Sequence, residues 1–105
     1  MATVYAKPGE KKAFSGGADI LICDLSEDGE YPVRAPSKVQ VTSEGFLFNA
    51  ATVTARGYNT TTYDPITVSD AISCILIGNE GNKLGSVKIS GVAAGSHYVT
   101  FLPSD

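Results

Sequence analysis

The apolar residues of this chain fall in short β-branched and aromatic runs that do not follow the rhythm of a helix. No window of helical length repeats its apolar positions with the period of an α-helix. Gly, Pro, Asn and Ser clusters divide the chain about every ten residues, which is typical of strands joined by turns. The pattern predicts strands at 3–5, 19–25, 39–42, 46–55, 66–68, 72–77, 84–89 and 97–102.

Two of these strands are apolar on both faces, which is typical of a strand inside a sheet. They are residues 19–25 and residues 72–77. A turn at 79–82 predicts that the second one forms a hairpin with residues 84–89. Seven or eight short strands at this spacing predict an all-β fold, either a small β-sandwich or a jelly-roll-like barrel.

The alternation along each strand also selects the side chains expected in the core. Apolar residues two positions apart share one face of a strand, so each strand contributes one such set. The predicted core consists of Ile20, Ile22, Val39, Val41, Phe48, Val53, Cys74, Leu76, Val87, Ile89, Val99 and Phe101.

The length of 105 residues predicts one domain, residues 1–105, because two halves would each be too small to bury a core. Only 18% of the residues are charged, against roughly 25% in soluble domains. This favours a subunit whose surface is partly covered by neighbours. A small monomer with strands rich in Ser and Thr has the same composition, and this alternative stays open.

The charge balance and the hydropathy pattern exclude two classes of partner. The net charge of −3 argues against electrostatic binding of nucleic acid, which needs Lys and Arg to neutralise phosphates. No apolar run approaches the roughly 18 residues of a membrane span. The first residues lack the apolar segment of a signal peptide, which predicts synthesis and retention in the cytoplasm unless the chain leaves as part of an assembly.

The two cysteines, Cys23 and Cys74, each stand inside an apolar run. In a cytoplasmic protein such residues are expected to be buried thiols that behave as small hydrophobic groups. A disulfide between two central strands is the alternative, since the spacing suits the cross-sheet bridge of immunoglobulin-like domains. The Trp that accompanies that bridge is absent from the chain.

One segment has the spacing that opens a calcium-binding loop. Asp24, Ser26 and Asp28 place oxygen-bearing side chains at alternate positions before Gly29. The position of the bidentate Glu is occupied by Ala35, however, so the segment is better explained as a hairpin turn. No metal and no cofactor are predicted.

The chain carries no convincing catalytic group. His97 is the only histidine, and it follows Ser96 at the start of a strand, with no nucleophile elbow nearby. Its separation from the two cysteines does not fit a zinc site. We therefore predict a protein without enzymatic activity, in which His97 is a plain polar residue. The alternative is a small β-barrel enzyme with His97 and a turn carboxylate as acid and base.

The longest polar loop, residues 56–65, presents Tyr58 and Tyr63 on either side of three threonines. Tyrosines on a polar loop can anchor an interface, because they offer a large rigid area with a polar tip. They can equally fold back on the edge of the core. If they face outward, they define an alternative function as a ligand- or carbohydrate-binding module.

The N-terminal segment, residues 1–14, has the features of an arm that pairs with a neighbouring molecule. A short strand carrying Val4 and Tyr5 is followed by a Pro-Gly break and by Lys7, Lys11 and Lys12. Such a strand can add to the sheet edge of another subunit through main-chain hydrogen bonds. This predicts a homo-oligomer or binding to another protein, with pairing inside the same chain as the alternative.

Residues 92–101, Val-Ala-Ala-Gly-Ser-His-Tyr-Val-Thr-Phe, resemble the stretch that leads into the tyrosine-corner strand of fibronectin type III and other immunoglobulin-like domains. The resemblance implies a β-sandwich. In that family another strand follows, whereas this sequence ends at Asp105. The resemblance therefore implies either a different topology or a strand supplied from elsewhere.

As a whole, the chain resembles the small decoration (cement) and accessory structural proteins of tailed bacteriophages. It shares their length, their richness in Gly, Ala, Ser and Thr, and a short extended N-terminus. The resemblance implies a virion subunit that binds a capsid lattice as an oligomer and catalyses no reaction. Its location would then be the host cytoplasm during synthesis and the virion afterwards.

Overall fold

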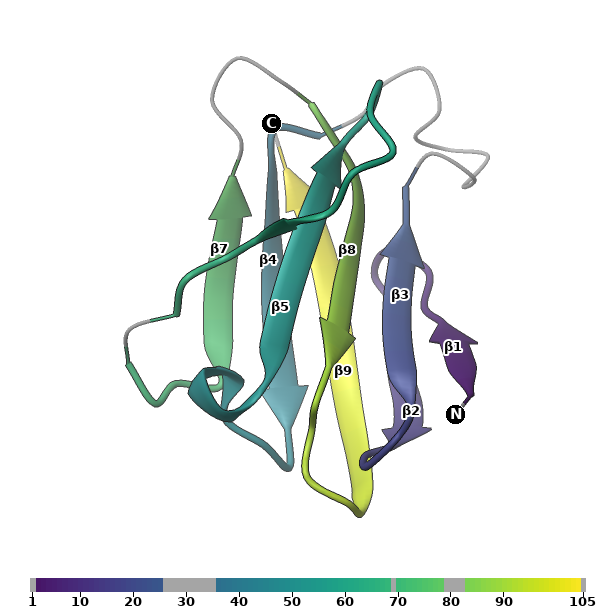
Figure 1. The fold of residues 1–105 in the computed structure, drawn as a ribbon, viewed down its shortest axis with the longest axis vertical. Helices are drawn as coiled ribbons and strands as arrows, with labels where there is room; N and C mark the ends of the chain where they lie inside the picture. The colour runs from purple at the N-terminus through teal and green to yellow at the C-terminus, as the bar shows by residue number, and fades with distance from the viewer. Residues whose placement is uncertain (1, 26–35, 69, 79–82, 105) are drawn as a thin grey trace.

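The computed structural model describes residues 2–25, 36–68, 70–78 and 83–104. Two β-sheets pack face to face (Figure 1), one with the strand order β1-β3-β8-β5-β6 and the other with the order β2-β9-β4-β7. The predicted all-β sandwich is therefore confirmed. The elements are β1 (Thr3–Tyr5), β2 (Lys11–Ser15), β3 (Ile20–Asp24), β4 (Lys38–Glu44), the 3-10 helix η1 (Phe48–Ala50), β5 (Thr52–Gly57), β6 (Asp64–Pro65), β7 (Cys74–Gly78), β8 (Leu84–Ser90) and β9 (Ser96–Ser104).

Alternating side chains build the core between the two sheets. Strand β4 buries every second residue, and its register places Val41 beside Phe101 of β9 and Ile75 of β7 on the inner face. Strand β8 contributes Val87 and Ile89 from the opposite sheet. Of the predicted core, Val39, Val41, Phe48, Val53, Val87, Ile89, Val99 and Phe101 are buried.

The face predicted to point inward was wrong in one strand of each sheet. In β3 the fully buried residues are Leu21 and Cys23, and the predicted Ile20 and Ile22 are only half-buried. Shifting the inward set of a strand by one residue moves every side chain to the other face. Because this strand is apolar on both faces, its own sequence does not distinguish the two registers.

Strand β7 shows the same reversal on the other sheet. Ile75 and Ile77 are buried, whereas Cys74 and Leu76 are exposed, so the expected apolar residues on the second face point to solvent. Cys74 is thus not a buried thiol, although Cys23 is, and no disulfide joins the two. The predicted central position of this strand was also wrong, since β7 is at the edge of its sheet.

Three local predictions differ from the structure. The hairpin of residues 72–77 with 84–89 is absent, because β7 pairs with β4 and β8 pairs with β3 and β5 in the opposite sheet. The strand expected over residues 46–55 is interrupted by η1, and β5 begins only at Thr52. The short strand expected at 66–68 lies earlier, at Asp64–Pro65.

The N-terminal segment supplies one edge strand to each sheet. Strand β1 runs parallel to β3, and β2 runs antiparallel to β9. The chain crosses between the sheets at Pro8-Gly9, where Gly9 has a φ of 80° and its N–H donates to Phe101 O at 2.7 Å. The structure thus shows pairing inside the same chain, the alternative to the proposed arm.

The strand β9 that carries the immunoglobulin-like resemblance lies between β4 and β2. Its second neighbour is the N-terminal strand β2 of the same chain, which agrees with the expectation of a different topology. Within the described residues, no helix has the length and hydropathy to cross a membrane.

Candidate protein-interaction surface

The outer face of the four-stranded sheet carries two exposed leucines in a row that holds no charge. The register places Leu76 of β7, Gln40 of β4 and Leu102 of β9 in this row across the sheet. Leu76 is 61% exposed and Leu102 is 46% exposed. The next row holds Cys74, Thr42 and Thr100, and it continues to Lys11 of β2, which is paired with Thr100. We define the neutral residues of β4, β7 and β9 in these two rows as the uncharged face: Gln40, Thr42, Cys74, Leu76, Thr100 and Leu102.

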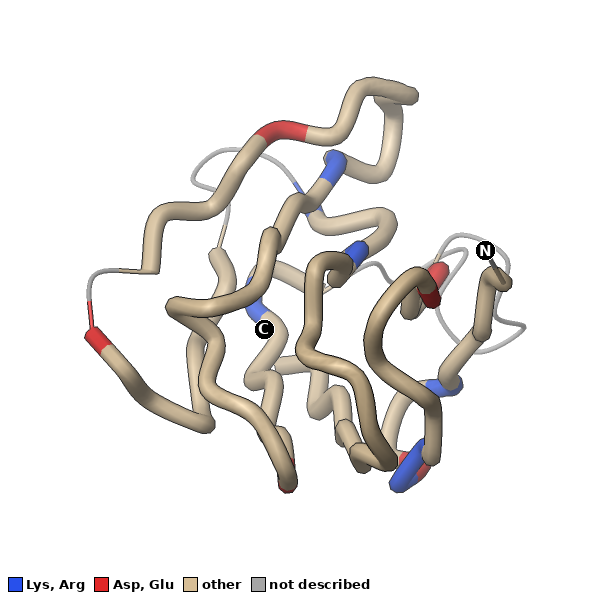
Figure 2. Tube along the Cα trace, turned by 60° about the horizontal axis from the view of Figure 1, so that its bottom comes forward, with Lys and Arg blue, Asp and Glu red and all other residues tan. Residues whose placement is uncertain are grey.

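Charged residues border the uncharged face. Beside Thr100, Lys11 of β2 forms an ion pair of 2.8 Å with Glu44 of β4, and its Nζ lies 5.0 Å from the centre of the Tyr98 ring. The Glu44 carboxylate accepts a hydrogen bond from Lys11 and raises the pKa of that ammonium group above its ordinary value. Beyond the row of Gln40, Lys38 stands beside Gly78. Figure 2 shows the charged residues separated along the chain by long uncharged stretches.

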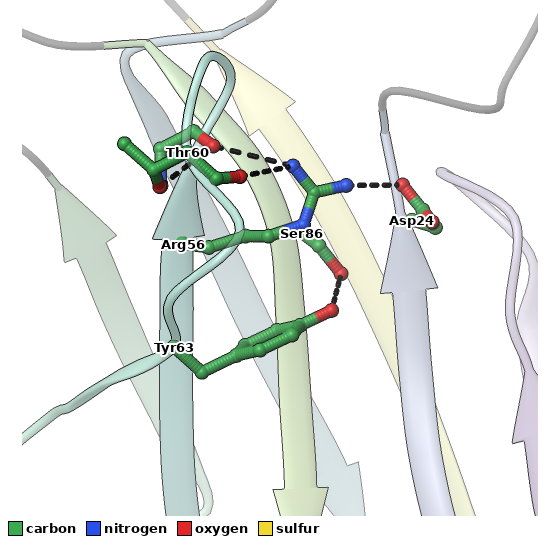
Figure 3. A network of polar contacts seen from close by, with 6 residues as sticks. Asp24, Arg56, Thr60, Tyr63 and Ser86 are labelled. Carbon is green, nitrogen blue, oxygen red and sulfur yellow. Dashed lines mark hydrogen bonds and ion pairs between the residues drawn. The ribbon is translucent and has the colours of Figure 1, made fainter.

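The outer face of the five-stranded sheet is organised around Arg56 of β5 (Figure 3). Its guanidinium donates to Asp24 Oδ1 of β3 at 3.1 Å and to the carbonyl oxygens of Gly57 and Thr60 at 3.2 Å each. The Arg56 and Asp24 side chains are only 13% and 22% exposed. Arg56 therefore ties the start of the polar loop to two strands of the sheet.

Tyr63 closes the same loop over the sheet (Figure 3). Its hydroxyl donates to Ser86 Oγ at 2.8 Å, and Lys88 Nζ lies 4.1 Å from the centre of its ring. Tyr58 is half-buried, with its backbone N–H bonded to Lys83 O at 2.7 Å. For Tyr63 the structure confirms the alternative in which the side chain folds back on the sheet. A ligand stacking on Tyr63 would have to displace Lys88 from that face of the ring.

His97 is buried inside the sandwich, with 5% of its surface exposed. Its ring centre lies 5.6 Å from that of Phe14 and 5.4 Å from that of Phe46, and Nε2 is 2.7 Å from Ala93 O. A Cβ atom added at Gly45 would lie 2.5 Å from Nδ1, so the ring is also tightly enclosed on that side.

This position gives His97 a structural role rather than that of an exposed polar residue. Nε2 lies within hydrogen-bond distance of Ala93 O, and Nδ1 is buried without a hydrogen-bond partner in the described part of the chain. A general acid or base must reach the substrate, and this ring is closed off by phenylalanines. The available sequence signal was the alternation of His97 with Val99 and Phe101, which places all three on the inner face.

Of the three predicted calcium ligands, the structure describes only Asp24. Asp24 is bonded to Arg56, while Ser26 and Asp28 lie outside the described residues. Among residues 2–25, 36–68, 70–78 and 83–104, no group of three or more His, Cys, Asp or Glu is arranged to hold a metal ion.

The predicted contact residues of the N-terminal segment do not form one surface. Tyr5, 62% exposed, lies at the outer edge of the five-stranded sheet, and Val4 packs partly against the core. Lys11 and Lys12 belong to β2 of the other sheet, where Lys12 is half-buried, and Lys7 is exposed between the two strands. The uncharged face was missed because it depends on the pairing of strands far apart in the sequence.

Comparisons with protein-family models, with curated proteins and with solved structures each found no match for this chain.

Proposed function

We propose that the protein is a structural subunit without catalytic activity, which binds a protein assembly through the uncharged face. The observation that carries the proposal is the combination of exposed Leu76 and Leu102 with neutral neighbours and a charged rim. The centres of protein interfaces are depleted of charged residues, and their rims are polar. Two neighbouring leucines lose contact with water when a partner covers them, which favours binding.

The partner we propose is the protein lattice of a viral capsid. The support is the resemblance of the chain, in length and composition, to phage decoration and accessory proteins. The outer surface of a sheet is also a shape that can lie flat on a repeating protein surface. In this proposal the protein is made in the host cytoplasm and is then incorporated into the virion.

The experiment pairs two threonine variants that differ only in the sheet they alter. Thr42 lies on the uncharged face, and Thr52 is exposed on the outer face of the other sheet. The neighbouring genes are first searched for a major head protein, and shells assembled from that protein are sedimented with each variant. Thr42→Lys should weaken co-sedimentation about tenfold or more, because it buries an unpaired charge, and Thr52→Lys should bind like the unaltered chain.

Two results would contradict the proposal at different points. Equal binding of both variants would exclude the uncharged face as the docking surface. A gene without head or tail genes nearby, together with absence of the unaltered protein from sedimented shells, would exclude the capsid as the partner.

A further inference from the structure

Strand β7 is an edge strand without the short length, charged residues or proline that often protect such an edge. Among the described strands, β1 and β6 are edges of only three and two residues, and β2 carries Lys11 and Lys12. Short length and lysines both discourage pairing with another chain. By contrast, β7 has five residues, Cys-Ile-Leu-Ile-Gly, with neither charge nor proline.

The backbone of β7 presents a regular set of groups at this edge. Ser43 N–H donates to Ser73 O at 2.8 Å, just before the strand, and the register continues with Val41 opposite Ile75. Backbone groups of successive residues in a strand point to opposite sides. The N–H and C=O groups of Cys74, Leu76 and Gly78 are therefore directed away from β4.

A groove runs beside the same edge. It has a volume of about 230 Å³ and is bounded by β7 and by residues of the segment that leads into it. Ile66, Val68 and Ile72 line it from that segment, and Ile75 and Leu76 line it from the strand. A strand added to β7 would thus find main-chain partners and apolar side chains together, as in recognition by β-augmentation.

Among the described residues, the charged side chains near the two ends of β7 have opposite signs. The exposed Asp70 precedes the beginning of the strand. At the other end Lys38 is opposite Gly78, and Lys83 lies nearby, with its Nζ 2.8 Å from Ser37 Oγ. Antiparallel pairing of two identical strands places the basic end of one against the acidic end of the other. This complementarity favours a second copy of the chain as the occupant.

We propose that β7 pairs antiparallel with β7 of a second copy, with Leu76 facing Leu76 at the two-fold axis. In this register Cys74 faces Gly78 of the second copy at both ends, and the outward groups form about six main-chain hydrogen bonds. The two four-stranded sheets become one continuous sheet, and the two uncharged faces become contiguous. The proposal does not depend on the capsid function, since it rests on the edge strand itself.

A new cysteine tests this register directly. Gly78→Cys would place a thiol opposite Cys74 of the second copy, at a Cα separation of about 5.5 Å that suits a disulfide. The site has room, since the atom nearest to an added Cβ is Lys38 Cγ at 3.7 Å. Within one chain the two positions are about 14 Å apart along the strand, which is too far for a bridge.

Mild oxidation of Gly78→Cys should give a covalent dimer that reductant reverses on a gel. Ala13→Cys is the matched control, because Ala13 is exposed on the same outer face but belongs to the opposite edge strand. Gly78→Cys with Cys74→Ala should lose the cross-link. A cross-link as slow as that of Ala13→Cys, or one that survives Cys74→Ala, would overturn the register.

Light scattering coupled to size exclusion tests the dimer without a new thiol. The mass of the unaltered chain should rise toward that of two chains at concentrations on the order of 100 µM, as for a small and weak interface. Leu76→Pro removes an outward N–H but none of the hydrogen bonds to β4, so it should abolish this rise while circular dichroism still shows β-structure. Leu76→Thr retains the N–H and should reduce the rise without abolishing it.

A single-chain mass at every concentration would overturn the dimer. Such a chain could still bind capsid shells, in which case only the self-pairing fails. Conversely, a dimer that does not sediment with shells would contradict the proposed function alone.

Discussion

The outer faces of the two sheets differ in whether a loop of the same chain makes contacts across them. On the five-stranded sheet, Arg56 and Tyr63 fold a loop back and engage Asp24 and Ser86 (Figure 3). On the four-stranded sheet, no described loop hydrogen-bonds across the central row, and Leu76 and Leu102 remain exposed. One face is partly covered by a loop of its own chain, whereas the other keeps Leu76 and Leu102 exposed.

This difference shows why overall composition is a poor guide to a binding surface. The low charge content of the sequence is an average over both sheets. The structure shows that the two faces differ in kind, since one holds Asp24, Arg56 and Lys88 and the other holds a neutral centre. The location of the charges, and not their number, identifies the surface that can be buried.

The largest expected effect is the difference in unfolding free energy between variants on the inner face and on the outer face of the four-stranded sheet. Phe101 is fully buried, and Leu102, its neighbour in β9, is 46% exposed. Phe101→Ala should lower the free energy of unfolding by about 3–5 kcal/mol, because it leaves a cavity in the core. Leu102→Ala should change it by no more than about 0.5 kcal/mol. Urea denaturation measures both, and similar losses would show that Leu102 serves stability rather than binding.

The next effect concerns the outer face of the five-stranded sheet, where the loop folds back. Arg56→Ala should cost about 1–3 kcal/mol of unfolding free energy, because the partly buried Asp24 and the loop carbonyls lose their donor. The matched control is Lys11→Ala, which removes an exposed ion pair on the other sheet and should lower the denaturation midpoint much less than Arg56→Ala does. If the two variants lowered the midpoint equally, the Arg56 contacts on the five-stranded sheet would not stabilise the fold more than the Lys11 ion pair on the four-stranded sheet.

A smaller effect is expected from the hydroxyl of Tyr63. Tyr63→Phe keeps the ring beside Lys88 but removes the donor to Ser86, which is fully buried. The expected cost is about 1 kcal/mol, measured by thermal or urea denaturation. Tyr58→Phe is the control, since the bond that holds Tyr58 to Lys83 is made by its backbone. An unchanged Tyr63→Phe variant would mean that the hydroxyl does not hold the loop.

Most of the fold could be predicted from the sequence because local signals carry it. Turn residues at short intervals delimit the strands, and Val39 and Val41 define the inner face of β4 by alternating with polar residues. Where a strand is apolar on both faces, as at Ile22 and Cys23 in β3, alternation loses this information. Strand β2 was not predicted for a similar reason. It begins with Lys11 and Lys12, and charged residues are typical of loops as well as of edge strands.

The candidate surface could not be predicted because it depends on long-range pairing. Gln40, Leu76 and Leu102 form one row only through the registers of β4 with β7 and β9. Arg56 and Asp24 are likewise 32 residues apart. A single sequence indicates which residues are exposed or buried along a strand whose apolar and polar residues alternate, but it does not state which strands are neighbours.

The smallest expected effect is the pH dependence of the ion pair between Lys11 and Glu44 beside the uncharged face. Glu44 raises the pKa of Lys11 in the folded state, mainly through the hydrogen bond and then through its charge. Folding therefore gains stability that is fully present below the pKa of Lys11 in the unfolded chain and is lost as the pH rises through its folded value. Both side chains are exposed, so salt should weaken the effect. An NMR titration of the Lys11 side chain should show its midpoint falling in Glu44→Gln, and equal midpoints in the two proteins would show that the pair does not form in solution.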